Sequence, residues 1–371
     1  MSSDKRRNYG IDFLRVILML LIVFAHLYSY TGINKSLPFL SLKWMFTWFT
    51  FSATVSAVNC YVIITGYYMS RTCYDLYKII KLWCKVLFYS VFVSMLLFIF
   101  GNLNISFGMV LNAFFPVLRK EYWFFTMYIL LFLFIPFMNV AINNMSKKMH
   151  KIMVCIILIF FYIEPLFSVV FYQYDLTKGY GIIIFVTLYI IGAFMARCED
   201  EIIVKKRYSA LLLLVSMGMM FLSKIILQLI VDRFGLTLGT GLLYHHDSIF
   251  VLINAIALFE LFKQIEISNP VIQKYIRWVS PSVFAVYLIH EKPAVRKLIW
   301  NDDHLAHFLE QCDFGIYVMS VAFVGIAVFV VCIVIDKILT WFLFRHIADS
   351  SAANWLKEKS ARYNEIVSKQ D

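Results

Sequence analysis

The chain contains ten long apolar stretches, each long enough to cross a lipid bilayer. A transmembrane helix needs about 20 mostly apolar residues to cross a hydrocarbon layer of about 30 Å. The stretches cover residues 10–30, 45–69, 79–100, 122–140, 151–171, 180–197, 209–231, 247–265, 281–299 and 314–344. Because backbone polar groups in lipid must be bonded within the segment, each stretch is expected to be a helix. The sequence therefore predicts an all-α, polytopic membrane protein of about ten transmembrane helices.

Composition supports this interpretation. Of the 371 residues, 61% are hydrophobic and only 15% are charged, whereas soluble domains are about half apolar and a quarter charged. The net charge of +11 does not indicate nucleic-acid binding, because the cations fall in short groups between apolar stretches. That placement is typical of membrane proteins.

The basic residues also predict the orientation. If the N-terminus is cytoplasmic, most of the 34 Lys and Arg residues fall in cytoplasmic segments, as the positive-inside rule requires. An even number of spans then places both termini in the cytoplasm. The chain is expected to be a multi-pass protein of the cell inner (plasma) membrane. With no internal repeat, residues 1–345 are expected to form a single transmembrane domain and residues 346–371 a short polar cytoplasmic tail.

Two ionisable residues lie on one face of the first span. Arg15 and His26 have ten residues between them, and the eleven steps return a helix to within about 20° of the same face, roughly 16 Å further along. Asp12, one turn before Arg15, can pair with it. Ionisable side chains within a span usually face a cavity or a partner. The alternative is that Arg15 reaches the headgroups and His26 packs between helices.

This arrangement of residues in the first span resembles the acyltransferase-3 family of membrane O-acyltransferases. The first span carries the pattern Ile-Asp-x-x-Arg, ten residues, then His. Further segments resemble the family in order over residues 8–300, namely Asn59–Arg71, Tyr122–Pro136 and Ser282–His290. One feature departs from the family pattern: its usual paired arginines are reduced to Arg71 followed by Lys78 and Lys81.

The resemblance implies transfer of an acyl group, usually acetyl from acetyl-CoA, to a hydroxyl of a surface polysaccharide or lipid-linked oligosaccharide. In that family the first-span histidine and arginine are tied to activity, and they map onto His26 and Arg15. Acetyl-CoA would be a co-substrate, with no permanently bound cofactor. A histidine suits this chemistry, since its pKa lies near neutrality. His26 could act as a general base or carry the acetyl group covalently. Arg15 is expected to position the donor, because the spacing places it too far from His26 to share a reacting atom.

The remaining candidate residues divide between the two substrates. For the phosphates of CoA, a cationic face at the start of the third span is expected to contribute, formed by Arg71, Lys78, Lys81 and Lys85; positive-inside placement alone would also explain it. For the acceptor, Trp123 could stack on a sugar, Glu121 could bind a hydroxyl, and His290 matches the family's late span. Solvation at loop ends and helix packing are the alternatives for these residues.

Several other polar residues are left without an assigned role. Glu164 and Lys224 interrupt two spans, and His245, His246 and Asp247 begin the eighth. Adjacent histidines point about 100° apart on a helix, so no metal site is expected.

A transporter or flippase for a lipid-linked sugar is the main alternative function. It would use a similar number of helices and similar intramembrane charges. Against it, the sequence shows neither repeated halves nor the paired, glycine- or proline-broken spans that form transport sites.

Overall fold

The computed structural model describes residues 7–72, 74–101, 106–166, 179–201, 204–235, 239–300, 303–344, 355 and 357–361. Within these ranges every regular element is helical. The α-helices are α1 (Tyr9–Tyr30), α2 (Ile33–Ser36), α3 (Leu42–Thr54), α4 (Ala57–Met69), α5 (Leu76–Ile99), α6 (Phe107–Phe114), α7 (Trp123–Asn144), α8 (Lys147–Leu158), α10 (Ile182–Arg197), α11 (Lys206–Phe234), α12 (Ile249–Lys263), α13 (Pro270–Val279), α14 (Val283–His290), α15 (Pro293–Trp300), α16 (Asp303–Gln311) and α17 (Phe314–Leu339). Short 3-10 or π segments are η1 (Ile159–Ile163), η3 (Leu242–Tyr244), η4 (Ser280–Ser282) and η5 (Thr340–Phe344).

The prediction of an all-α polytopic membrane protein is confirmed. Eight helical segments of the described chain are long and apolar enough to cross a membrane, and α10 is a shorter apolar helix of 16 residues. Large apolar side chains stay exposed on the outer faces of α5, α7, α11 and α17, where a soluble protein would carry charge. Of the predicted tail, Trp355 and residues 357–361 are helical, and the rest lies outside the described residues.

The predicted ninth span, residues 281–299, is wrong as a single helix. The structure places two eight-residue helices there, α14 and α15, separated at Glu291 and Lys292. The cause is Pro293, which lacks an N–H group and disfavours the helical conformation of the residue before it. The break leaves two charged side chains next to the end of α14.

The second predicted span, residues 45–69, also consists of two helices. Helix α3 ends at Thr54 and α4 begins at Ala57. Near this break the hydroxyls of Ser52, Thr54 and Ser56 each donate to the backbone carbonyl three residues earlier. Such bonds compete with the helical ladder, and Ser56 also donates to Asn254 at 3.0 Å. The break therefore places polar side chains in the middle of this membrane-spanning segment.

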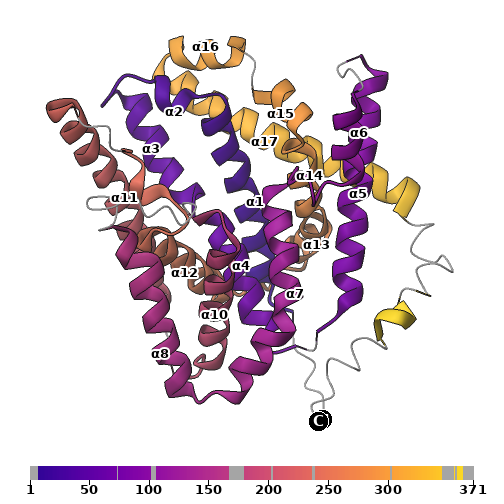
Figure 1. The fold of residues 1–371 in the computed structure, drawn as a ribbon. Helices are drawn as coiled ribbons and strands as arrows, with labels where there is room; N and C mark the ends of the chain where they lie inside the picture. The colour runs from indigo at the N-terminus through magenta and orange to yellow at the C-terminus, as the bar shows by residue number, and fades with distance from the viewer. Residues whose placement is uncertain are drawn as a thin grey trace.

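Helix α1 lies at the centre of the bundle, with α3, α4, α12, α14 and α17 packed around it (Figure 1). Helices α11 and α8 lie on one side of it and α5 with α6 on the other. Almost half of the α1 residues are buried, including Leu14, Leu18 and Val23. Any cavity beside α1 is therefore shielded from lipid by the surrounding helices.

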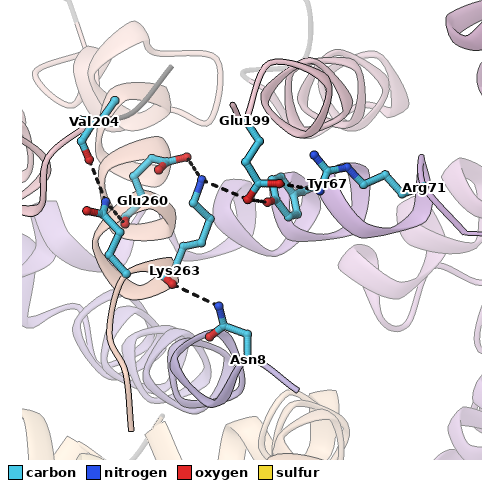
Figure 2. A network of polar contacts seen from close by, with 8 residues as sticks. Asn8, Tyr67, Arg71, Glu199, Val204, Glu260 and Lys263 are labelled. Carbon is cyan, nitrogen blue, oxygen red and sulfur yellow. Dashed lines mark hydrogen bonds and ion pairs between the residues drawn. The ribbon is translucent and has the colours of Figure 1, made fainter. Parts of the chain in front are cut away.

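Segments that the sequence assigns to the cytoplasm meet at one end of the bundle, here called the inner end. Figure 2 shows Glu199, after α10, contacting Tyr67 of α4, Arg71 just after α4, and Lys263 of α12. Asn8, before α1, donates to the Lys263 carbonyl at 3.1 Å. Burial favours a raised pKa for Glu199, but hydrogen bonds from Tyr67 and Arg71 outweigh it and lower that pKa, so this acid stays ionised and holds three helix ends together.

The segments assigned to the other side meet at the opposite, outer end. Lys43 donates to the Cys312 carbonyl at 3.0 Å, joining the first turn of α3 to the loop before α17. Tyr30, at the end of α1, donates to Glu291 at 2.8 Å. The grouping of loops thus follows the predicted topology, and the cytoplasmic placement of the inner end remains a prediction.

Helices α4 and α10 are in close backbone contact through two glycines. A Cβ atom at Gly66 would lie 2.3 Å from the Tyr189 carbonyl oxygen, and one at Gly192 would lie 2.4 Å from the Ile63 carbonyl oxygen. Small residues permit this close approach between transmembrane helices. The contact fixes α4, which forms one wall of the site described below.

We expect Gly66→Ala to destabilise the protein by about 1–3 kcal/mol, because overpacking forces the two backbones apart. The measurement is the midpoint of thermal aggregation of detergent-purified protein. Gly218→Ala in α11 is the matched control, since a Cβ atom there has open space around it. Equal midpoints for the two variants would contradict the close contact.

Candidate active site

A cavity of about 630 Å³ runs beside α1 from Arg15 to Arg296; we call it the central cavity. Helix α1 lines it with Arg15, Met19, Ile22, Ala25, His26, Ser29 and Tyr30. These positions repeat every three or four residues, so they form one stripe along the helix. The stripe covers fifteen residue steps, which is about 22 Å of helix rise. The two residues singled out in the sequence therefore line one cavity that extends through most of the bilayer thickness.

Arg15 forms the inner part of the central cavity. Its Nη1 atom lies 2.9 Å from Oδ1 of Asp12, which is the pair expected from their spacing. The guanidinium lies 5.9 Å from the Tyr68 ring centroid, and the Tyr61 hydroxyl donates to the Arg15 backbone carbonyl. About a third of the Arg15 side chain, 36%, remains exposed. Its fork of N–H donors is thus oriented by one carboxylate and still reachable from the cavity.

His26 lies near the outer end of the stripe and contacts the break between α14 and α15. Its Nδ1 atom is 2.9 Å from Nε2 of His290 and 3.1 Å from Oε2 of Glu291. The second oxygen of Glu291 is occupied, because it accepts from Tyr30 at 2.8 Å and from Arg296 at 3.1 Å. The structure therefore brings together groups that are more than 260 residues apart in the chain.

These contacts determine which nitrogen of His26 carries the proton. Nδ1 of His290 contacts the Val286 carbonyl, which can only accept, so Nδ1 of His290 must donate. In a neutral ring, Nε2 of His290 is then an acceptor for the proton on Nδ1 of His26. The Nε2 atom of neutral His26 consequently holds a free lone pair, which is the arrangement that a general base or nucleophile needs.

His26, His290 and Glu291 also form the kind of group that could hold a metal ion, since one ligand atom of each lies within 4.8 Å of the others. Two nitrogens bound to one tetrahedral zinc ion would lie about 3.3 Å apart. The observed 2.9 Å between the rings is a hydrogen-bond length. The three residues therefore fit a hydrogen-bonded array, and the sequence-based expectation of no metal remains a prediction.

Aromatic rings form much of the wall at the outer end of the central cavity, where Trp123, Tyr180, Tyr244 and His246 line it. The Trp123 indole stacks on His246 with ring centroids 5.7 Å apart, and its N–H donates to the Tyr180 carbonyl at 2.8 Å. Trp123 thus lies in the wall of the central cavity at its outer end. The His-His-Asp segment that the sequence left unassigned contributes one residue, His246, to this wall.

Glu121 does not line the central cavity. It forms a buried ion pair with Lys292, Oε1 to Nζ 2.8 Å, and the two side chains are only 6% and 4% exposed. Ser90 donates to the second oxygen of Glu121 at 2.8 Å. The carboxylate is therefore committed to Lys292, the residue at the break after α14. Direct binding of an acceptor hydroxyl by Glu121 is not supported by this position.

His290 is fully buried and reaches the cavity only through His26. Its observed role in the array is to accept the His26 proton. We therefore interpret His290 as a residue that supports His26, in place of the predicted role on the acceptor side.

The four predicted donor-binding cations lie at the inner end but differ in their contacts. Arg71 pairs with Glu199 at 2.7 Å, and Lys78 is exposed and lies 3.7 Å from Asp75. Lys81 is exposed. Lys85 forms an ion pair of 3.0 Å with the buried Asp336 of α17. None of the four lines the central cavity.

Helix α5 nevertheless brings two of these lysines close to the cavity. Leu82 is the α5 residue in its lining. Lys78 and Lys85 lie four residues before and three residues after Leu82, and such positions share a helix face. The cationic face therefore borders the inner part of the cavity without entering it.

Sequence reasoning missed Glu291, Arg296, Lys292, Tyr30 and Asp336. The sequence did contain a signal for Glu291, Lys292 and Arg296, because these charged residues interrupt the predicted apolar span 281–299. Asp336 lay similarly inside the last span. Of the other interrupting residues, Lys224 lies in α11, 4.2 Å from the Trp48 ring centroid and bonded to Thr240. Lys224 does not line the central cavity.

Fold and site together define a polytopic membrane protein in which a histidine and an arginine share one transmembrane cavity. A family model described as an acyltransferase domain, Acyl_transf_3, matches residues 8–337. The chain therefore belongs to the acyltransferase-3 family and is a membrane acyltransferase. Searches of curated proteins and of solved structures gave no match.

The central cavity predicts that solvent reaches both halves of the α1–α4 region. In a chain whose own cysteines are replaced by serine, Ser29→Cys and Thr65→Cys should react with a small hydrophilic thiol reagent, because both residues line the cavity. Leu18→Cys is the control, since Leu18 is fully buried and lies outside the lining. Mass spectrometry of the labelled protein provides the measurement; equal, low labelling at all three positions would contradict a hydrated cavity.

Proposed function

We propose that this chain moves an acetyl group from cytoplasmic acetyl-CoA to a hydroxyl of a surface glycan or lipid-linked sugar, in the plasma membrane. One observation carries the proposal: Arg15 and His26 line a single cavity along α1. Such a cavity suits a reaction whose donor and acceptor come from opposite sides of the membrane. Family membership supports acyl transfer, and acetyl-CoA and a glycan are the substrates that the resemblance implies.

The inner end suits the donor. Coenzyme A carries several phosphate charges, and guanidinium and ammonium groups bind phosphates through charge-assisted hydrogen bonds. Arg15, Lys78 and Lys81 offer such groups, with Lys85 and Arg71 next to them in ion pairs. The long, thin pantetheine arm would then extend along the stripe of Met19 and Ile22. This arrangement would bring the thioester toward His26.

The outer end suits the acceptor. Rings of Trp123, Tyr180 and Tyr244 line the cavity there, and aromatic faces stack on the apolar faces of sugar rings. An acceptor held against them would place a hydroxyl near Nε2 of His26. We assign Trp123 to acceptor binding on this basis.

In the direct mechanism, Nε2 of His26 removes the hydroxyl proton as the hydroxyl oxygen attacks the thioester carbonyl carbon. A new C–O bond forms, the C–S bond breaks, and the proton passes from the imidazolium to the leaving thiolate, which departs as free CoA. In the covalent variant, Nε2 itself attacks the carbonyl carbon, the C–S bond breaks and the CoA thiolate leaves. The acceptor hydroxyl oxygen then attacks the acetyl carbon, the bond to Nε2 breaks, and the hydroxyl proton passes to the thiolate to give free CoA. Both variants need the lone pair on Nε2.

His26→Ala should lower acetyl transfer by about 10²–10⁴-fold, the usual contribution of a general base. The measurement is the O-acetyl signal in NMR spectra of surface glycan from cells that make each variant at matched membrane abundance. His150→Ala is the control, because His150 is a buried histidine of α8 that bonds the Ile190 carbonyl outside the cavity. Undiminished O-acetylation in the His26 variant would exclude this mechanism.

Arg15→Ala should raise the KM for acetyl-CoA by about 10-fold or more, because a charge-assisted contact with the donor is lost. Initial rates with isotope-labelled acetyl-CoA in membranes that contain the host's own glycan provide the measurement. Arg277→Ala is the control, since Arg277 lies at the inner end and bonds the Tyr9 hydroxyl without lining the cavity. A variant altered only in its use of the acceptor would overturn the assignment of Arg15 to the donor.

A further inference from the structure

Within the described part of the chain, Glu291 is the one carboxylate that lines the central cavity. It follows α14 directly, at the break that Pro293 imposes. Its Oε1 atom is held by the Tyr30 hydroxyl and the Arg296 guanidinium. Its Oε2 atom has no hydrogen-bond partner within the described part of the chain and lies 3.1 Å from Nδ1 of His26. One oxygen is therefore anchored, and the other is directed at the imidazole.

The two groups that anchor Glu291 are themselves held in place. Arg296 bonds the Tyr30 hydroxyl at 3.1 Å and lies 4.6 Å from the centroid of its ring. Tyr30 in turn lies one helical turn after His26, with ring centroids 5.0 Å apart. The carboxylate is thus fixed relative to the same helix that carries the histidine, so its distance from Nδ1 does not depend on a flexible loop.

We propose that Glu291 is a positioning residue for the acyl transfer: its carboxylate, 3.1 Å from Nδ1 of His26, stabilises the imidazolium that forms when Nε2 takes a proton from the acceptor hydroxyl. This inference rests on the function proposed above. The Nδ1 proton itself is bonded to His290, and the Glu291 carboxylate lies beside that bond without accepting it. His290 is neutral in this arrangement, whereas Glu291 supplies the negative charge that a positively charged ring attracts.

The proton balance of the step is simple. The hydroxyl proton moves to Nε2 while the Nδ1 proton remains in place, so His26 becomes a cation beside the Glu291 carboxylate. When the thiolate leaves, Nε2 returns the proton to sulfur and His26 is neutral again. Glu291 keeps its charge throughout and gains no proton. The contribution of Glu291 is greatest when His26 is charged. Loss of Glu291 should therefore slow the chemical step rather than weaken substrate binding.

Glu291→Gln provides a sharp test, because it replaces an acceptor by a donor. Tyr30 and Arg296 both donate, so they hold the amide oxygen, and the amide NH₂ group must then face Nδ1 of His26. The negative charge beside the imidazolium is then lost, while His290 still accepts from Nδ1 of His26. We expect kcat to fall by about 10- to 100-fold, as for the loss of one close opposite charge, with the KM for acetyl-CoA unchanged.

The control is Glu201→Gln, which makes the same chemical change in a surface ion pair with Lys147 and should leave kcat and KM unchanged. Rates are measured with labelled acetyl-CoA in membranes that contain the host's glycan. A second readout is the ¹⁵N NMR spectrum of histidine-labelled protein, with the His26 signal assigned by its loss in His26→Ala. Both proteins should show a neutral ring protonated on Nδ1, and the imidazolium of His26 should form at lower pH in Glu291→Gln than in the wild type, because the carboxylate beside it is gone.

Tyr30→Phe covers the case in which Glu291→Gln does not fold. It keeps the carboxylate and removes one of its two anchors, so a smaller fall in kcat at constant KM is expected. An active wild type with unchanged kcat in both variants, or with imidazolium formation at the same pH in the wild type and Glu291→Gln, would overturn the role of Glu291 alone. A wild type that fails to transfer acetyl from acetyl-CoA would instead overturn the proposed function and this inference with it.

Discussion

The structure depends on one constraint, which is that an ionisable side chain within a bilayer must face a partner or a cavity. Helix α1 meets it by placing Arg15 and His26 on a single stripe that the other helices shield from lipid. The same stripe is then available to both sides of the membrane. The burial of ionisable side chains thus gives the protein a cavity along α1, in which the proposed donor and acceptor would meet.

Breaks in the transmembrane helices supply the polar groups around this path. The break at Pro293 leaves Glu291 and Lys292 at membrane depth, and each has a definite partner. Lys292 pairs with Glu121 in a fully buried site, where removal of either charge would leave the other uncompensated. Glu291 faces His26. The Lys292–Glu121 ion pair therefore holds the break in place. At the break, the Glu291 carboxylate lies next to His26.

The two ends of the central cavity differ in physical character, which would separate the two proposed substrates. Near Arg15 the surroundings are cationic, and Glu199 and Asp336 balance two of the neighbouring charges. Near Trp123 the lining is aromatic and largely uncharged. An anionic nucleotide carrier and a sugar acceptor would thus each meet complementary chemistry, and His26 lies between them.

The sequence by itself determined the properties that repeat along one helix. Apolar length gave the membrane-spanning architecture, and an eleven-residue spacing placed Arg15 and His26 on one face, because both depend only on helix geometry. Tertiary structure decided what those residues meet. His290 and Glu291 reach His26 from 264 and 265 positions away, and no local period encodes such a contact. Likewise, only packing showed that Glu121 is committed to an ion pair, because its partner lies at a helix break within a segment that hydrophobicity alone presents as continuous.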